Sequence, residues 1–271
     1  MAASVAARPA PVRGEAADRV RTGGVLARLL SVAVLLWAAL CGIGYLLTHA
    51  LRATSFERLD GATDRWLARH RSAPWNAVTH WLTYAAETIT VLAAGLIVLV
   101  TLRLYLHRWR ESLFLLAALA GEVTIFLCTT LIIDRDRPTV THLDDAPPTS
   151  SFPSGHTAAA ICLYGAVAII AVRTSRRAWL RTVAVLAAVL VPSCVAFARL
   201  YRGMHYPSDV IGGAVLSLGW LAAIWLILLR PGRAESPVHP ESPAYQESRA
   251  HQESTVHQES TVHQLDGDTG R

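Results

Sequence analysis

Long apolar stretches alternate with short polar ones through most of the chain. The six apolar stretches cover residues 29–47, 81–102, 112–133, 157–172, 182–198 and 210–229. A bilayer core about 30 Å thick needs roughly 20 helical residues, and the fourth stretch reaches this length when residues 154–156 form its first turn. The pattern predicts an all-α, polytopic membrane bundle of six transmembrane helices. The first stretch exceeds the apolar core of a signal peptide, about 7–15 residues, so we interpret it as an anchor.

The predicted membrane domain spans residues 24–230 and is flanked by two polar tails. Residues 1–23 are rich in alanine and arginine without apolar periodicity, which predicts a disordered basic tail. Residues 231–271 contain six-residue repeats such as VHQEST and predict a second disordered tail, although its histidines could bind a metal weakly. Between the first two spans, residues 52–79 form either a short amphipathic helix at the membrane interface or a polar loop.

The composition strengthens the membrane prediction and orients the chain. Only 17% of the residues are charged and 52% are apolar, whereas an ordinary soluble domain has about 25% charged residues. All 25 basic residues are arginine, and before residue 234, 14 of them share the side of the N-terminus while nine lie opposite. Because arginine concentrates in cytoplasmic loops, we expect a plasma membrane protein with both termini in the cytoplasm. The four cysteines lie within apolar stretches and predict neither disulfides nor a zinc site.

Three polar clusters mark the ends of the predicted helices. Residues 135–138 follow the third span, residues 153–156 begin the fourth, and residues 199–209 join the fifth to the sixth. The loops after the third and fifth spans lie on the same side of any membrane, because two crossings separate them. The three clusters can therefore meet in one site at one membrane face.

The residue types in these clusters suit a phosphate group. Arginine binds phosphate oxygens through its planar guanidinium and keeps its charge at any working pH. Ser154 and Gly155 stand where a helix begins, so their backbone N–H groups and the helix dipole favour an anion. We therefore predict a phosphate cradle at this point.

Two histidines supply candidate reaction chemistry. His205 and Asp209 are four residues apart, one helical turn, so the carboxylate can accept the Nδ1–H of the imidazole. That hydrogen bond would leave Nε2 neutral and available as a nucleophile. His156 could protonate the leaving oxygen and later deprotonate a water molecule. Because no set of side chains has metal-ligand spacing, we expect no metal or other cofactor and assign charge neutralisation to the arginines.

The clusters resemble the signature motifs of the type 2 phosphatidic acid phosphatase superfamily, which run Lys-x6-Arg-Pro, Pro-Ser-Gly-His and Ser-Arg-x5-His-x3-Asp. The second motif is matched in full by residues 153–156, and the third is matched at Arg199, His205 and Asp209. The first is matched by residues 137–138. The resemblance covers about residues 25–230 and includes the six-helix plan.

The resemblance assigns a role to each matched residue. It implies that His205 attacks phosphorus to form a phosphohistidine, that Asp209 orients His205, and that His156 is the general acid. It also implies metal-independent catalysis at a site that opens to the outer leaflet. The residues implied to bind the phosphoryl oxygens are Arg137, Arg199, Ser154 and Gly155.

Two positions depart from the motifs. Thr130 stands where the first motif has its lysine, and Ala198 stands where the third usually has serine. Thr130 cannot supply the charge of lysine. We hypothesise that Arg135 replaces it as a phosphate ligand, because residues i and i+2 of an extended segment point the same way.

Together these observations predict a membrane phosphatase that hydrolyses the phosphate ester or diphosphate of a lipid. Phosphatidic acid, phosphatidylglycerol phosphate and polyprenyl diphosphate all fit, and the sequence does not choose among them. The alternative, favoured by Thr130 and Ala198, is an inactive relative that binds or transports a lipid phosphate. We expect a lipid phosphate but no nucleic acid as partner, and the sequence leaves the oligomeric state open. Glu122, inside the third span, either bonds a neighbouring helix or lines a polar route to the site.

Overall fold

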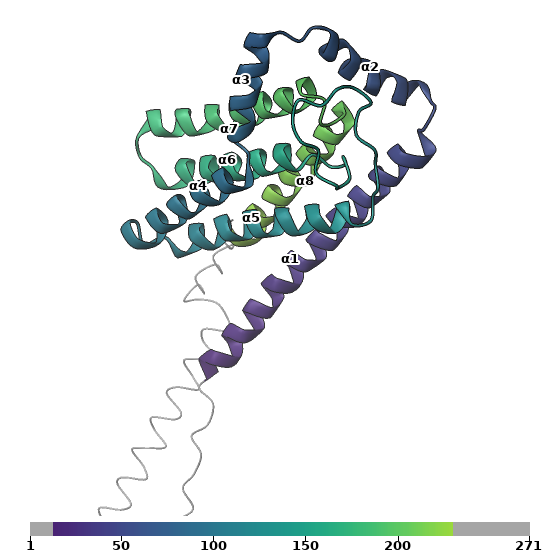
Figure 1. The fold of residues 1–271 in the computed structure, drawn as a ribbon. Coiled ribbons are helices and arrows are strands. Elements are labelled where there is room, and N and C mark those ends of the chain that lie inside the picture. Colours follow the sequence, from purple (N-terminus) through teal and green to yellow (C-terminus); the bar gives the residue numbers. More distant parts are fainter. Residues whose placement is uncertain (1–12, 230–271) are drawn as a thin grey trace, which may run out of the picture. The chain divides into compact units, whose positions relative to one another are not determined.

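The structure, a computed structural model, describes residues 13–229, which form helices and connecting loops without a strand. Figure 1 shows the eight α-helices. They are α1 (Arg13–Tyr45), α2 (Ser55–Arg69), α3 (Ala73–Tyr84), α4 (Thr88–Val100), α5 (Trp109–Thr130), α6 (Gly155–Thr174), α7 (Ala178–Tyr201) and α8 (Pro207–Ile224). Helices α1, α4 and α8 continue into π-helical turns at Leu46–Ala50, Thr101–Tyr105 and Trp225–Leu229. The all-α prediction is confirmed.

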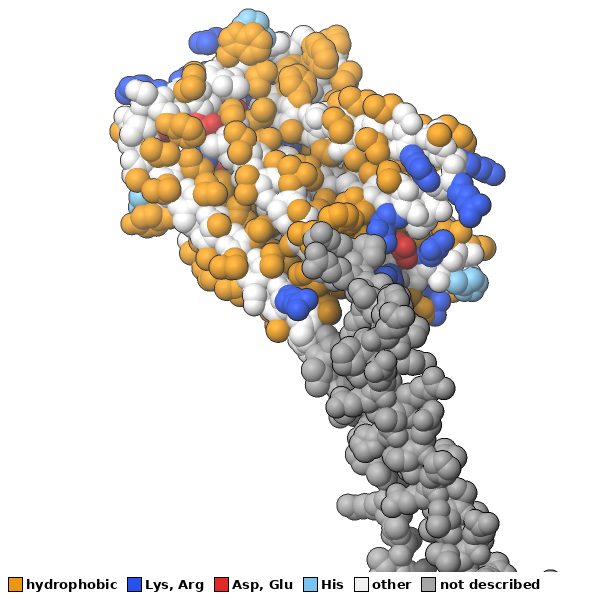
Figure 2. Space-filling model, turned by 180° about the vertical axis from the view of Figure 1, so that it is seen from behind, with side chains coloured by type: hydrophobic (Ala, Val, Ile, Leu, Met, Phe, Trp, Pro, Cys, Tyr) orange, Lys and Arg blue, Asp and Glu red, His pale blue; other side chains and the backbone are white. Residues whose placement is uncertain are grey.

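Six of these helices are long and apolar enough to cross a membrane, namely α1, α4, α5, α6, α7 and α8 with their π-helical turns. Large apolar side chains are exposed on their outer faces, among them Leu131 at 85% and Ile89 at 80%. Figure 2 shows hydrophobic side chains spread over much of one face of the helical unit. Such a surface suits lipid rather than water. The chain is a multi-pass membrane protein with six apolar helices, as predicted.

The second predicted span, residues 81–102, is not a single helix. Helix α3 ends at Tyr84, and α4 begins at Thr88 after Glu87, whose backbone is extended at φ −67° and ψ 149°. The helix that is long enough to cross a membrane is therefore Thr88–Tyr105. Hydropathy along the chain misses this break because Glu87 is the one charged residue in the stretch 81–102.

The N-terminal tail is shorter than predicted. Helix α1 begins at Arg13, so residues 13–23 of the predicted disordered tail are helical. The sequence after Pro11 contains residues that favour a helix, among them Glu15, Ala16, Ala17 and Arg19. The rest of that tail, residues 1–12, and the predicted C-terminal tail, residues 231–271, lie outside the described residues.

Between α1 and α4 the chain forms the helices α2 and α3 rather than a polar loop. Helix α2 packs against α7 and α8 with a face that buries Asp60, Asp64 and Leu67. Two large apolar side chains of this helix, Leu59 and Trp66, are 70% and 54% exposed. Helix α2 therefore presents two carboxylates to the bundle, at the end where α8 begins.

Helix α6 lies at the centre of the bundle and packs against α5, α7 and α8. Its beginning lies close to α8, since a Cβ atom on Gly213 would be 2.5 Å from the carbonyl oxygen of Ser154. A glycine at this position lets the two helices approach without a clash. This contact brings residues 153–156 beside residues 205–209.

Candidate active site

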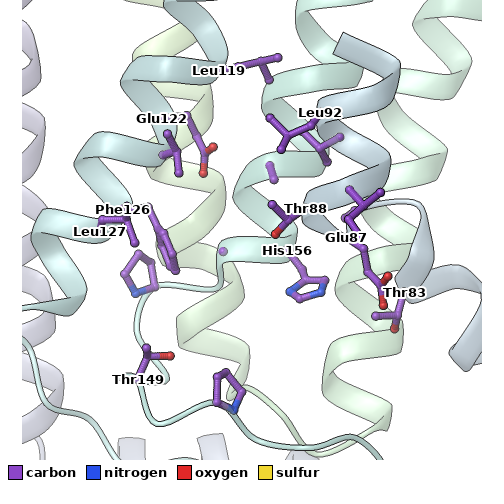
Figure 3. A pocket seen from close by; sticks show the side chains of 18 of the residues that line it. Thr83, Glu87, Thr88, Leu92, Leu119, Glu122, Phe126, Leu127, Thr149 and His156 are labelled. Carbon is purple, nitrogen blue, oxygen red and sulfur yellow. The ribbon is translucent and has the colours of Figure 1, made fainter. Parts of the chain in front are cut away.

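A cavity of about 970 Å³ opens where the loops after α5 and α7 meet the beginning of α6. Arg137, His156, Arg199 and His205 line its polar end, and apolar residues of α4 and α5 line a groove that continues from it. Figure 3 shows His156 in this cavity, with Leu92, Leu119 and Glu122 further along the groove. The structure thus brings together residues from all three predicted clusters.

The beginning of α6 has the backbone arrangement expected of an anion site. Ser154 is the N-cap and Gly155 the first helical residue, which leaves N–H groups of the first turn without helical partners. The Ser154 N–H donates to the carbonyl oxygen of Asp209 at 2.9 Å. Its hydroxyl lies 3.0 Å from that of Thr157 and is buried beneath the cavity. Gly155 and His156 line the cavity, whereas Ser154 supports them from below.

Arg137 and Arg199 present guanidinium groups to the cavity with hydrogen-bonding capacity to spare. Arg137 donates from Nη1 to the carbonyl oxygen of Met204 at 2.8 Å. The Nε atoms of both arginines are buried and have no hydrogen-bond partner among residues 13–229. Burial lowers the pKa of Arg137, with partial compensation from the charge of Asp209. Buried cationic donors without partners suit an anion with several oxygen atoms.

Asp144, in the loop between α5 and α6, binds two arginines, of which Arg199 lines the cavity. Its carboxylate accepts from Arg199 Nη1 at 2.9 Å and from Arg202 Nε at 2.7 Å. Burial would raise the pKa of Asp144, but the hydrogen bond from Arg202 and the charge of Arg199 keep it below its usual range. Asp144 therefore remains a carboxylate and orients Arg199.

His205 is oriented by a different partner from the one we predicted. Its Nδ1 lies 2.8 Å from the carbonyl oxygen of Ser151, whereas Asp209 Oδ2 lies 3.8 Å away, beyond hydrogen-bond distance. The predicted helical spacing does not apply, because α8 begins at Pro207, after His205. A carbonyl oxygen can only accept, so Nδ1 carries the proton and the lone pair of Nε2 is free. Burial lowers the pKa of His205 despite the nearby Asp209.

Asp209 lies behind His205 and anchors the segment that carries it. Its carboxylate accepts from the Ser151 hydroxyl and from the backbone N–H of Tyr206, both at 2.8 Å. The same Ser151 provides the carbonyl oxygen for His205. Asp209 thus acts on the orientation of His205 through Ser151 and Tyr206.

Arg135 lies outside the cavity, which corrects its predicted placement beside the phosphate. Its guanidinium is buried between α2 and α8, where Nη2 donates to Asp60 Oδ2 at 2.8 Å and Nη1 donates to Ser208 Oγ at 2.7 Å. It also forms an ion pair with Asp209. Residues 135 and 137 diverge because this segment is an irregular loop, fixed by a hydrogen bond from Ser151 N–H to the Arg135 carbonyl. Arg135 therefore holds the Asp209 carboxylate in place from outside the cavity.

The family model of the PAP2 superfamily matches residues 111–233, which contain all three clusters. Over this segment, which is just under half of the 271 residues, the chain is similar to the PAP2 superfamily.

The chain is also similar to two curated relatives and to one solved structure. The sequence is 35% identical over 121 residues to an undecaprenyl-diphosphatase of Sulfolobus acidocaldarius, a match that covers 43% of this chain and only 49% of that relative. It is 27% identical over 183 residues to phosphatidylglycerophosphatase B of Bacillus subtilis, covering 64% of this chain and 85% of the relative. The crystal structure of a transmembrane PAP2-type phosphatidylglycerolphosphate phosphatase from Bacillus subtilis has a TM-score of 0.58 and 24% identity, over 74% of this chain and 94% of that one.

Within this site, Thr130 occupies the position at which the first PAP2 motif has its lysine. Thr130 lines the cavity, and its hydroxyl donates to the carbonyl oxygen of Leu127 in its own helix at 2.9 Å. A side chain at this position therefore reaches the cavity wall, but threonine brings no charge to it.

Three residues of the candidate site were not among those predicted. Asp60 and Asp144 come from segments without a motif, and Ser151 contributes its carbonyl oxygen as well as its hydroxyl. Sequence spacing offers little signal for Asp60, which lies 75 residues from Arg135. The pair of acidic residues at 144–145, close to an arginine-rich motif, is a weak signal for Asp144.

Proposed function

We propose that this protein is an integral-membrane lipid phosphatase that hydrolyses a phosphate ester or diphosphate through a phosphohistidine, without a metal ion. One observation carries the proposal. The free Nε2 of His205 shares a cavity with His156 and two arginines, and that cavity continues into an apolar groove. A polar pocket for phosphate joined to an apolar groove suits a phosphorylated lipid.

The first step is the transfer of the phosphoryl group to His205. Arg137, Arg199 and the N–H groups at the beginning of α6 bind the phosphoryl oxygens and offset the charge that develops on them. The Nε2 lone pair of His205 attacks phosphorus, and the bond from phosphorus to the leaving oxygen breaks. His156 donates a proton to that oxygen, which leaves as the lipid alcohol or lipid monophosphate.

The second step releases phosphate. His156, now neutral, accepts a proton from water as the water oxygen attacks phosphorus. The bond between phosphorus and His205 Nε2 breaks, which restores the free imidazole. The Ser151 carbonyl and Asp209 keep the ring in one orientation through both steps, and two arginines supply the positive charge that a metal ion would otherwise provide.

The position of the site suggests where the substrate comes from. The loops that carry the three clusters lie at the ends of α5 and α7 and at the beginnings of α6 and α8, on one side of the bundle. The arginine distribution favours cytoplasmic termini, so we place the site at the outer face of the plasma membrane. A lipid headgroup in that leaflet reaches the cavity while its chains lie along α4 and α5.

Phosphate release from a panel of lipid phosphates tests this proposal. The purified protein should release phosphate in the presence of EDTA, and His205→Ala should abolish release. His70→Ala, which removes an exposed histidine just after α2 and outside the cavity lining, is the matched control and should retain the rate. If wild type and His205→Ala release no phosphate from any lipid of the panel, the proposed phosphatase activity is refuted. Loss of activity in EDTA would refute the metal-free mechanism.

A second candidate function is favoured by Thr130 and Ala198, the two departures from the motifs. Without the motif lysine, the protein could bind or transport a lipid phosphate without cleaving it. The same panel separates the two functions, since a binding protein would retain a lipid phosphate through purification and release no phosphate from it.

A further inference from the structure

Glu122 is a carboxyl group inside the apolar groove. It lies on α5 with 5% of its surface exposed, and its neighbours along the groove include Leu92, Leu119 and Phe126. Figure 3 shows its carboxyl group pointing into the cavity, on the side where His156 lies. The side chain therefore faces the space that the lipid part of a substrate would occupy.

The protein offers this carboxyl group no hydrogen-bond partner within residues 13–229. The nearby thiol of Cys162 donates to the carbonyl oxygen of Ala118 at 3.2 Å instead. A buried polar group without a partner destabilises a protein, and structures rarely keep one without a reason. A ligand that supplies the missing partner would gain affinity from it.

The depth of Glu122 indicates which part of a lipid it meets. Phe126 lies beside the phosphate cradle, because a Cβ atom on Gly155 would be 2.8 Å from its ring. Glu122 precedes Phe126 by four residues, so it lies one helical turn, about 6 Å, deeper in the groove. In a diacylglycerol phosphate only a few covalent bonds separate the ester carbonyls from the phosphate. The carbonyls therefore lie at a distance from the phosphate comparable to this helical turn. In a polyprenyl diphosphate that region is hydrocarbon.

We propose that Glu122 donates a hydrogen bond from its carboxyl group to an ester carbonyl of the substrate and thereby selects glycerolipid phosphates over polyprenyl diphosphates. This inference rests on the proposed lipid phosphatase activity. A neutral carboxyl group has one O–H donor, and the amide of glutamine can replace it. Leucine fills a similar volume without a donor. A polyprenyl chain gives Glu122 no partner, so the polar group weakens its binding.

The test compares kcat/KM for dioleoyl phosphatidic acid, its dialkyl ether analogue and a polyprenyl diphosphate. Glu122→Leu should lower kcat/KM for the diacyl substrate about 3- to 10-fold, the effect of one neutral hydrogen bond. It should leave the polyprenyl value unchanged or raise it. Glu122→Gln should stay within about twofold of wild type on the diacyl substrate. Wild type should prefer the diacyl substrate to the ether analogue, and Glu122→Leu should lose this preference.

Leu119→Ala is the matched control for a change in groove shape, since it alters the same wall one turn away without removing a donor. It should change all three kcat/KM values by a similar factor. If Glu122→Leu lowers kcat/KM equally for all three substrates, the inference is overturned and Glu122 is a packing residue. An unchanged kcat/KM for the diacyl substrate would overturn it as well. If wild type cleaves none of the substrates, the proposed phosphatase activity fails instead. If Glu122→Leu does not fold, Glu122→Ala replaces it, and its kcat/KM for the diacyl substrate is compared in the same way with its values for the other two substrates.

Discussion

Arg135 Nη2 lies 2.8 Å from Asp60 Oδ2, and this buried ion pair joins the loop after α5 to helix α2. Asp60 also accepts from the backbone N–H of Ser208 at 3.0 Å, in the first turn of α8. Arg135 in turn pairs with Asp209, and Asp209 holds Ser151. A helix outside the six spans therefore supports the orientation of the proposed nucleophile.

Asp60→Asn should weaken this support. The substitution removes the charge that balances Arg135 in a buried position, so we expect a loss of about 3 kcal/mol in the free energy of unfolding. Because Arg135 and Asp209 then shift, kcat should fall about tenfold while KM changes little, since the proposed phosphate ligands Arg137 and Arg199 remain in place. Steady-state kinetics and thermal unfolding in detergent measure both effects.

Asp64→Asn is the matched control for that variant. Asp64 lies one turn from Asp60 on the same buried face, but neither of its carboxylate oxygens has a hydrogen-bond partner in the described part of the chain. We expect kcat to stay within about twofold of wild type, because no bonded chain links Asp64 to His205. Equal losses of kcat in both variants would contradict the specific role of Asp60.

The stability of the protein should depend on pH through Asp64. Burial, reinforced by the charges of Asp60 and Asp209, raises the pKa of Asp64 to about 8 from 3.8 in the unfolded chain. Between about pH 4 and pH 8 the folded protein therefore holds a proton that the unfolded chain has released, so stability falls as pH rises through this window. The unfolding temperature of wild type should decline more steeply there than that of Asp64→Asn. Parallel pH profiles of the two proteins would show that Asp64 titrates normally.

The acid limit of activity should lie below pH 6.5. Burial lowers the pKa of His205 from 6.5, and the charges of Arg199 and Arg137 act in the same direction while Asp209 opposes them. The Nε2 lone pair therefore remains free in mildly acidic solution. Single-turnover rates should be measured as a function of pH with both a monoester and a diphosphate. A decline of the rate at low pH that is common to both substrates reports a group of the enzyme. A common acid limb above pH 6.5 would be inconsistent with the buried, uncharged nucleophile.

Thr130→Lys should increase activity by restoring the motif lysine at the cavity wall. An ammonium group that reaches a phosphoryl oxygen contributes about 1.5 kcal/mol, so kcat/KM should rise about tenfold. Thr130→Gln supplies similar length without the charge and should give less than about twofold. A lysine variant no more active than the glutamine variant would mean that this site has no use for a third cation.

The features of this structure that depend on the local pattern of apolar and polar residues could be predicted from the sequence. The lengths of the apolar stretches predicted six membrane-spanning helices. Successive loops of such a protein lie on alternate sides of the membrane, which predicted that residues 135–138, 153–156 and 199–209 would meet. The break at Glu87 escaped prediction because one charged residue does not interrupt an apolar stretch of this length. Such a break depends on how α3 and α4 pack, which the periodicity of one segment does not contain.

The side-chain partners within the site were less predictable than the site itself. Spacing suggested that Asp209 would accept from His205, but α8 begins after His205, and the Ser151 carbonyl takes this role. Arg135 was expected beside Arg137, yet an irregular loop turns it toward Asp60. Each of these partners comes from a segment distant in sequence, and backbone carbonyls leave no mark in residue type.

The most direct test of the account is the detection of phosphate bound to His205. His156→Ala should slow hydrolysis of the intermediate, so incubation with a lipid diphosphate labelled at its terminal phosphate should label the protein. The label should be stable in base and labile in acid, and mass spectrometry should locate it on His205. The double variant His156→Ala/His205→Ala should carry none. Turnover that continues without His205, or label found on another residue, would contradict the account.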